Sequence, residues 1–208
     1  MNALRFDSLS TNPRAHEARA SGYTLIELLI VVVVMGIAGA MVIPSMSRAG
    51  VLRIHAAVRS IVADLTFAQS DAAAFQQRRV VYFGQVASWD DAASAWTVAP
   101  GNGYTLYAPP AGAANVDLVN DIMFDPFKAN EAFTTSFDAS KYGGAQIANA
   151  SFNGTPMVIF DELGGTGLNL TSDAPGVGGS VQVVGPLSTF TISVDAFTGR
   201  VTVTKTTP

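Results

Sequence analysis

Glu27 is the ionisable side chain in the most unusual chemical setting of this sequence. It precedes a long apolar run, because residues 28–43 (LLIVVVVMGIAGAMVI) contain no charged side chain. A carboxylate beside such a stretch is costly to remove from water, and residues of this kind are normally retained for a function. Glu27 is therefore the first candidate for a site, and a positively charged group would be its natural partner.

Side chains suited to catalysis are scarce in the rest of the chain. The 208 residues include no cysteine, and the only two histidines, His16 and His55, lie in the first third. Residues 80–208 therefore cannot supply a histidine triad or a histidine-ligated metal. Two acidic doublets, Asp90-Asp91 and Asp161-Glu162, could serve a two-carboxylate hydrolase, but neighbours on a strand point to opposite faces. We expect no enzyme and no cofactor.

Charge is unevenly distributed along the chain. The formal net charge of −4 combines +1 in residues 1–22, +3 in residues 45–79 and −7 in residues 80–208, with Glu27 adding −1. Because phosphate binding needs clustered positive charge, the acidic C-terminal region argues against nucleic acid as its main partner.

Hard cations take oxygen ligands, so a calcium site could be formed by three loop acids, Asp117, Asp121 and Asp125. No fixed calcium-loop pattern surrounds them, and solvated acids are the simpler interpretation.

The apolar run itself has three interpretations. A spanning helix needs about twenty mostly apolar residues, and Tyr23–Ile43 supplies twenty-one, interrupted only by Thr24 and Glu27. The first interpretation is a plain membrane anchor. The second is a conventional signal peptide cut after Ala40, at the small-residue sequence Ala38-Gly39-Ala40, which would release a soluble exported β-domain. The third depends on the residues that precede the run.

The string Gly22-Tyr23-Thr24-Leu25-Ile26-Glu27-Leu28-Leu29 resembles the class III signal of type IV pilins and pseudopilins. In that family a prepilin peptidase cuts after the glycine and methylates the new N-terminus. The resemblance implies that residues 1–22 are a cytoplasmic leader that is removed. Tyr23, where the family usually has phenylalanine, would become the first mature residue. Glu27 would then be the fifth residue, as in the family, and Pro44 the twenty-second, where proline is common.

The same resemblance implies a role for each of these positions. Glu27 would pair with the new N-terminal amine of its own or a neighbouring subunit. Residues 23–44 would form a transmembrane and assembly helix, with Gly36 and Pro44 bracketing a segment that bends; alternatively, Pro44 merely ends the membrane helix. The implied partners are the prepilin peptidase, other pilins, an inner-membrane assembly platform and secreted cargo. The chain would be a single-pass protein of the bacterial inner membrane, with its head in the periplasm, before it enters a pseudopilus or pilus.

Residues 45–79 predict an amphipathic helix. Apolar residues recur at steps of three and four, which places them on one helix face. This stripe consists of Val51, Ile54, Val58, Ile61, Leu65, Ala68, Ala72 and Phe75. We expect one continuous helix from about Tyr23 to about Arg78, with the stripe packed against the domain that follows.

Residues 80–208 predict a β-rich head, so the fold class is α+β: a long N-terminal helix on an antiparallel β-domain. Pro100-Gly101-Asn102-Gly103 is interpreted as a hairpin turn, and residues 108–150 as an irregular insertion with one short strand. Further strands are expected at 80–83, 96–98, 104–107, 157–160, 180–184, 189–194 and 200–203. Residues 195–199 form the turn between the last two.

Three head segments resemble the GspH/FimT pseudopilins of type II secretion. They are residues 64–72 with the approach to Val80, Phe160-Asp161 with Gly164-Gly165, and Thr198-Gly199-Arg200-Val201. Some members of this family bind DNA for uptake through a C-terminal glycine-arginine turn. A DNA-uptake pilin that uses Arg200 and Lys205 is therefore an alternative. However, Thr202 stands where those members have a second basic residue, and Arg200 could instead pair with Asp195.

Overall fold

The computed structural model describes residues 22–206, with the side chains of residues 40–51 excepted. The leader residues 1–21, including His16, lie outside the described residues, as do the side chains of Ala40, Pro44 and Val51. The chain divides into two units at Ile43 and Pro44, and each is described by itself. Helix α1 (Leu25–Phe75) contributes residues to both units.

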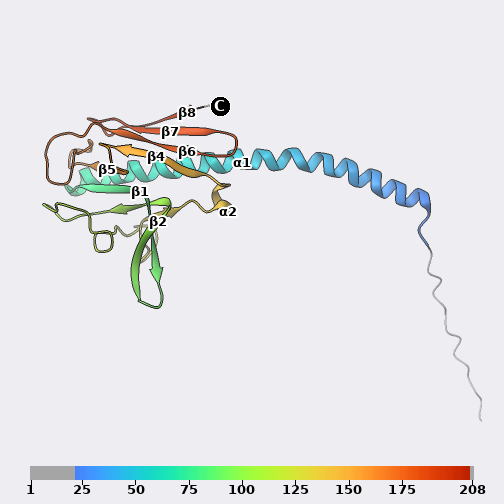
Figure 1. Ribbon diagram of the computed structural model, residues 1–208, viewed down its shortest axis with the longest axis horizontal. Helices are drawn as coiled ribbons and strands as arrows, with labels where there is room; N and C mark the ends of the chain where they lie inside the picture. Colours follow the sequence, from blue (N-terminus) through green and yellow to red (C-terminus); the bar gives the residue numbers. More distant parts are fainter. Residues whose placement is uncertain (1–21, 207–208) are drawn as a thin grey trace, which may run out of the picture. The chain divides into compact units, whose positions relative to one another are not determined.

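The head confirms the predicted α+β class, with one long helix followed by an antiparallel β-domain (Figure 1). One sheet has the strand order β3-β2-β1-β5. It comprises β1 (Arg79–Asp90), β2 (Ala95–Tyr107), β3 (Thr134–Ser136) and β5 (Met157–Phe160). The other sheet has the order β4-β6-β7-β8. It comprises β4 (Gln146–Phe152), β6 (Gly179–Val184), β7 (Thr189–Val194) and β8 (Val201–Thr206).

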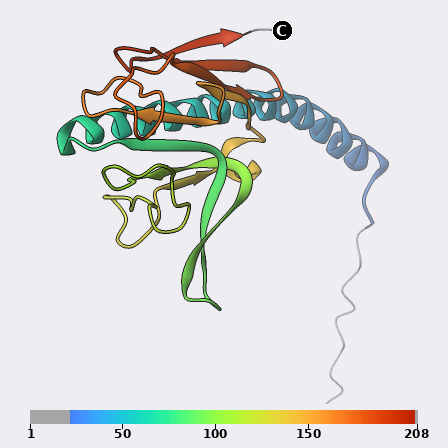
Figure 2. The ribbon, with the colours of Figure 1, turned by 60° about the vertical axis from the view of Figure 1, so that its left-hand side comes forward.

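The C-terminal half of α1 packs between the two sheets, as both ribbon views show (Figures 1 and 2). The residues of the stripe from Ile54 to Ala72 are buried, and Ala57 joins them. Together with apolar side chains of both sheets they form one core. Phe75 is an exception at 66% exposure, because it is the last helical residue and the sheets no longer cover it. The prediction that this helix face packs on the head is confirmed.

The predicted hairpin turn at Pro100-Gly101-Asn102-Gly103 is wrong. These residues lie inside β2, and the hairpin turn is at residues 91–94. The pairing changes register between Phe83–Tyr104 and Gln85–Pro100, so that residues 101–103 oppose Gly84 in a bulge. Gly84 has φ +82, which glycine adopts at little cost. Beyond the bulge the β1–β2 hairpin leaves the rest of the sheet and projects outward (Figure 2).

The insertion at 108–150 contains more regular structure than we expected. It includes β3, a short helix α2 (Ala139–Tyr142) and most of β4. Asn102 of the bulge holds this region, because its amide nitrogen donates to the carbonyl of Ala145 (2.9 Å) and its amide oxygen accepts from the N–H of Ile147 (2.9 Å). The same residues that suggested a turn therefore anchor the insertion.

A polar contact links α1 to β2 within the core. The hydroxyl of Tyr104 donates to Asp64 Oδ2 at 2.5 Å, and Thr135 donates to the same oxygen at 3.4 Å. Burial raises the pKa of Asp64 above its ordinary value of 3.8, although the hydrogen bond from Tyr104 opposes that shift. The carboxylate is therefore held in the core by two donors from one sheet.

Tyr104→Phe tests this contact, and Tyr107→Phe provides a matched control. Both tyrosines are fully buried on β2, but within residues 22–206 the hydroxyl of Tyr107 has no hydrogen-bond partner. We expect Tyr104→Phe to lower the free energy of unfolding by about 1.5–3 kcal/mol, because Asp64 loses its main donor. Tyr107→Phe should be neutral or stabilising, since it removes a buried unpaired hydroxyl. Denaturant unfolding of both variants measures the difference, and equal losses would contradict the assignment.

Candidate processing and assembly site

The Gly22–Tyr23 peptide bond precedes the first helix. Residues 22–24 are not helical, and α1 begins at Leu25. Gly22 and Tyr23 are exposed, Tyr23 at 84%. A protease needs a segment that is accessible and can become extended, and a bond within a helix offers neither. The bond expected to be cut therefore lies where a peptidase can reach it.

Thr24 caps the helix that follows this bond. Its hydroxyl accepts the N–H of Glu27 at 3.3 Å, and its carbonyl accepts the N–H groups of Glu27 (3.1 Å) and Leu28 (3.2 Å). Thr24 and Glu27 thus occupy the N-cap and third positions of α1, the spacing of a capping box. This role of Thr24 was not predicted, although the Thr-x-x-Glu pattern signals it.

Glu27 is exposed in the first turn of α1. A carboxylate in that position is favoured by the positive end of the helix dipole. Tyr23, Glu27, Leu28 and Val31 line one shallow groove of about 290 Å³. Glu27 therefore lines the same groove as Tyr23, the residue that would carry the new N-terminal amine after cleavage.

An apolar helix surface surrounds this groove. From Tyr23 to Ile37 every large apolar side chain is at least half exposed. None of the helices in residues 22–206 combines the length and hydropathy needed to cross a membrane, so the spanning role expected for residues 23–44 is not confirmed. Gly36 and Pro44 both lie inside α1, so the alternative that Pro44 ends the helix is wrong. The bend at these two positions stays a prediction.

Residues 18–43 match the family described as "Prokaryotic N-terminal methylation motif". Neither the curated proteins nor the solved structures include a chain that matches this one. The matched segment covers Gly22, Tyr23 and Glu27, and it supports the type IV pilin-like class with prepilin cleavage and methylation. Such a motif also implies export of a membrane-anchored precursor and assembly with other pilins.

Three head segments meet at one point, which we call the Gln69 junction: α1 around Gln69, the glycine turn after β5 and the last hairpin. The side-chain amide of Gln69 donates to the carbonyls of Gly164 and Thr198, both at 2.7 Å. These partners are 95 and 129 residues away in the sequence. One amide therefore ties the helix to the glycine turn after β5 and to the last hairpin.

The glycines of the Gln69 junction are required by close approach. A Cβ on Gly199 would lie 2.2 Å from the carbonyl oxygen of Gly164 and 2.6 Å from Gln69 Nε2. A Cβ on Gly165 would lie 2.7 Å from the carbonyl oxygen of Phe197. Gly199 also has φ +61, a left-handed value. These two glycines thus have a packing role in this chain.

Three of the four carboxylates in the acidic doublets make structural contacts. Asp161 Oδ1 accepts the N–H groups of Leu163 (2.9 Å) and Gly165 (2.8 Å), while Glu162 pairs with Arg78. Asp90 Oδ1 accepts two N–H groups of the β1–β2 turn. Each of these carboxylates is therefore used in shaping a turn or pairing an arginine.

The three acids considered for calcium also form turns. Asp117 accepts the N–H groups of Val119 and Asn120, and these hydrogen bonds lower its pKa. Asp121 accepts the N–H of Asp117, and Asp125 accepts the N–H of Phe127. Across residues 22–206, no three His, Asp or Glu side chains are grouped so that they could hold a metal ion.

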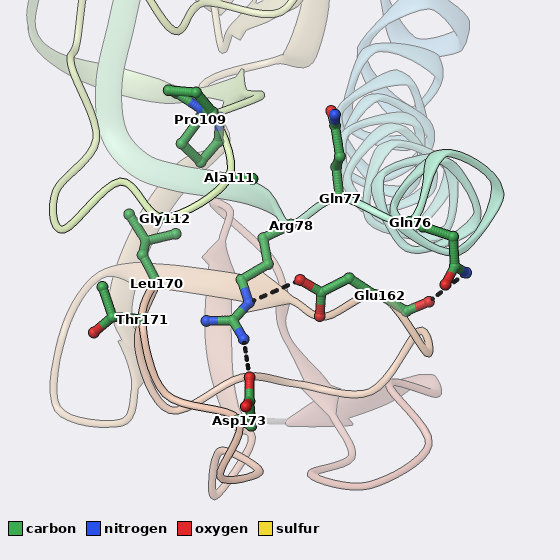
Figure 3. Close-up of a pocket in the computed structure, with 11 residues that line it drawn as sticks. Gln76, Gln77, Arg78, Pro109, Ala111, Gly112, Glu162, Leu170, Thr171 and Asp173 are labelled. Carbon is green, nitrogen blue, oxygen red and sulfur yellow. Dashed lines mark hydrogen bonds and ion pairs between the residues drawn. The ribbon is translucent and has the colours of Figure 1, made fainter.

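Arg78 lines a cleft of about 280 Å³ beside the C-terminal end of α1 (Figure 3). Its guanidinium donates to Glu162 (3.2 Å), to Asp173 (3.0 Å) and to the carbonyl of Asn169 (3.0 Å). Gln76 reaches the carbonyl of Glu162 from the helix end (3.0 Å). These contacts connect the end of α1 to the loop that follows β5.

The two residues considered for DNA contact lie on the last hairpin. Arg200 is exposed just before β8, and Lys205 is exposed on β8. In the described part of the chain neither residue forms an ion pair within 4.0 Å, so the suggested bridge from Arg200 to Asp195 is not formed. Asp195 instead accepts N–H groups of Thr198 and Phe197, and the bond from Thr198 is the main cause of its lowered pKa.

Proposed function

We propose that this chain is a minor pilin or pseudopilin of the GspH/FimT type that serves a type II secretion pseudopilus or a type IV pilus. The observation that supports this proposal most directly is the exposed Gly22–Tyr23 bond, which lies just before a capped helix with Glu27 in its first turn. These residues lie within the segment that matches the methylation motif. A prepilin peptidase cuts after Gly22 and methylates Tyr23.

The proposed action is mechanical. The precursor is held in the bacterial inner membrane by residues 23–44 with the head in the periplasm, and an assembly platform then adds the mature chain to a filament. The exposed apolar surface of residues 23–37 supports this role, because such a surface is stable only when lipid or other helices cover it. The head then provides contacts to other pilins or to secreted cargo.

The mature N-terminus is the direct test of this proposal. Intact mass and terminal-peptide sequencing of the full chain, with and without a co-expressed prepilin peptidase, should show a peptidase-dependent start at Tyr23 that carries one added methyl group. Gly22→Glu should abolish that cut, because a bulky charged residue then precedes the bond. Ala40→Leu should leave it unchanged, because it removes the small-residue cleavage sequence and keeps the segment apolar. A start after Ala40, lost in Ala40→Leu, would overturn the proposal in favour of a conventional signal peptide.

A further inference from the structure

Two tryptophans of the β1–β2 hairpin and one phenylalanine of the loop after β2 form a partly exposed aromatic cluster, which we call the aromatic patch: Trp89, Trp96 and Phe124. Trp89 and Trp96 are directly opposite on the two strands, with ring centroids 5.4 Å apart and planes at 71°. Phe124 lies 6.4 Å from Trp96 at 66°. Trp89 is 50% exposed and Phe124 is 53% exposed. The three rings line a shallow groove of about 570 Å³ together with Asn130 and Glu131.

The exposure of the aromatic patch to water is unfavourable in an isolated chain. Beyond the bulge at Gly84 the hairpin leaves the rest of the sheet (Figure 2). Two of the three rings, those of Trp89 and Phe124, are about half exposed. Aromatic side chains are the largest apolar groups a protein can bury, and a contiguous exposed group of them with a polar rim typically marks a binding surface. Trp96 packs partly on the core, which fixes the orientation of the patch.

The surroundings of the aromatic patch are acidic. Glu131 lines the groove, Asp90 and Asp91 follow Trp89 in the sequence, and Asp125 follows Phe124, with Lys128 as the one cation of residues 89–131. Lys128 is already engaged, at 3.1 Å from Glu131 Oε2 and 4.0 Å from Asp125 Oδ2. Aromatic faces also carry negative electrostatic potential. Both features favour a partner that presents a cationic side chain on an apolar surface.

The same chain contains such a surface on the outer side of α1, which we call the basic face. Leu52, His55, Ala56, Arg59 and Ser60 line an open, mainly apolar groove there. Residues 45–79 carry a net charge of +3 against −7 for residues 80–208. Arg78 and Arg79 of this segment are held by Glu162 and Asp71, whereas Arg59 is exposed and forms no ion pair within the described residues. Arg59 is therefore available to a partner.

We propose that the aromatic patch of one copy binds the basic face of a second copy, with Arg59 placed over the indole rings. The charges of the two surfaces are complementary, and arginine over tryptophan is a favourable cation–π pair. The surfaces differ from each other, so the contact is heterologous and can repeat without closing, as a helical filament requires. The inference rests on the proposed function, because the filament in which the contact would occur is part of that proposal. The contact itself can be measured on a chain that is neither cleaved nor assembled.

Tryptophan fluorescence provides a site-specific readout, because the only two tryptophans of the chain are both in the aromatic patch. We expect the full chain in detergent to show a concentration-dependent blue shift as the rings become covered. Arg59→Glu and Asp91→Lys should each weaken this association at least about tenfold, because like charges then face one another. Both side chains are exposed, so the variants should fold. Lys141→Glu, exposed on α2, is the matched control and should leave the shift unchanged.

Mixing the two variants separates this contact from all others. Arg59→Glu presents a negative basic face and Asp91→Lys a less negative patch rim, so the mixture should recover the blue shift that each variant alone has lost. Association through residues 23–44, or detergent bound to the patch, would respond to neither charge. A constant spectrum at all concentrations, or a shift that both variants retain, overturns the inference. A chain that is cut at Tyr23 yet shows no shift would overturn this contact alone, and a shift without cleavage would overturn only the proposed function.

Discussion

Replacing Glu27 with glutamine should leave the chain processed at Tyr23 but reduce its incorporation into a filament at least about tenfold. In the proposed filament, the new amine of Tyr23 would bring a positive charge onto a helix surface that is otherwise apolar and that neighbouring helices would cover. Leaving one member of an ion pair without its partner in such a buried setting costs about 3–5 kcal/mol, and tenfold corresponds to about 1.4 kcal/mol. Quantifying the variant in sheared filaments and in the membrane fraction, relative to the unchanged chain, measures the loss.

Thr24→Ala separates the charge of Glu27 from its position in the helix. This change removes the hydroxyl that accepts the N–H of Glu27 and so weakens the start of α1 by about 1 kcal/mol, but it keeps the carboxylate. We expect Thr24→Ala to assemble nearly normally. If Glu27→Gln also assembles normally, the carboxylate has no role in selecting subunits. If both variants fail to assemble to the same extent, a stably formed first helical turn matters more for assembly than the charge of Glu27.

The sequence predicted the features that arise from local periodicity and local motifs. The stripe from Ile54 to Ala72 repeats at steps of three and four, and burial of one helix face requires only that spacing. The strands Met157–Phe160 and Thr189–Val194 have the predicted bounds, because each is a short apolar run between turn residues. The processing segment was recognised from eight consecutive residues, and the methylation motif matches there.

Features that depend on long-range pairing could not be predicted in the same way. Pro100-Gly101-Asn102-Gly103 has the composition of a hairpin turn, and only its pairing with Gly84 shows that it forms a bulge within β2. The Gln69 junction joins Gln69 to Gly164 and Thr198, which are 95 and 129 positions further along the chain. No local pattern reveals such contacts. The aromatic patch likewise depends on the register that places Trp89 opposite Trp96, and on a loop residue, Phe124.

Gly199→Ala should be among the most destabilising single-methyl changes in the head. The added Cβ would lie 2.2 Å from the carbonyl oxygen of Gly164, and the residue would have to keep φ +61. Overpacking against backbone and a left-handed conformation together should lower the free energy of unfolding by about 2–4 kcal/mol. Denaturant unfolding followed by circular dichroism measures this loss.

Gly154→Ala is the matched control for this change. Gly154 has φ +80 but open space around its Cβ position, so the same substitution should cost only the backbone term of about 1–2 kcal/mol. The excess loss in Gly199→Ala then reports the crowding at the Gln69 junction. Gln69→Ala removes two hydrogen bonds, but it should cost less stability in the Gly199→Ala background than in the unchanged chain, because there it also relieves the crowding by Gln69 Nε2. If the two glycine variants lose equal stability, the junction relaxes around a methyl group, and close packing does not explain the glycine at position 199.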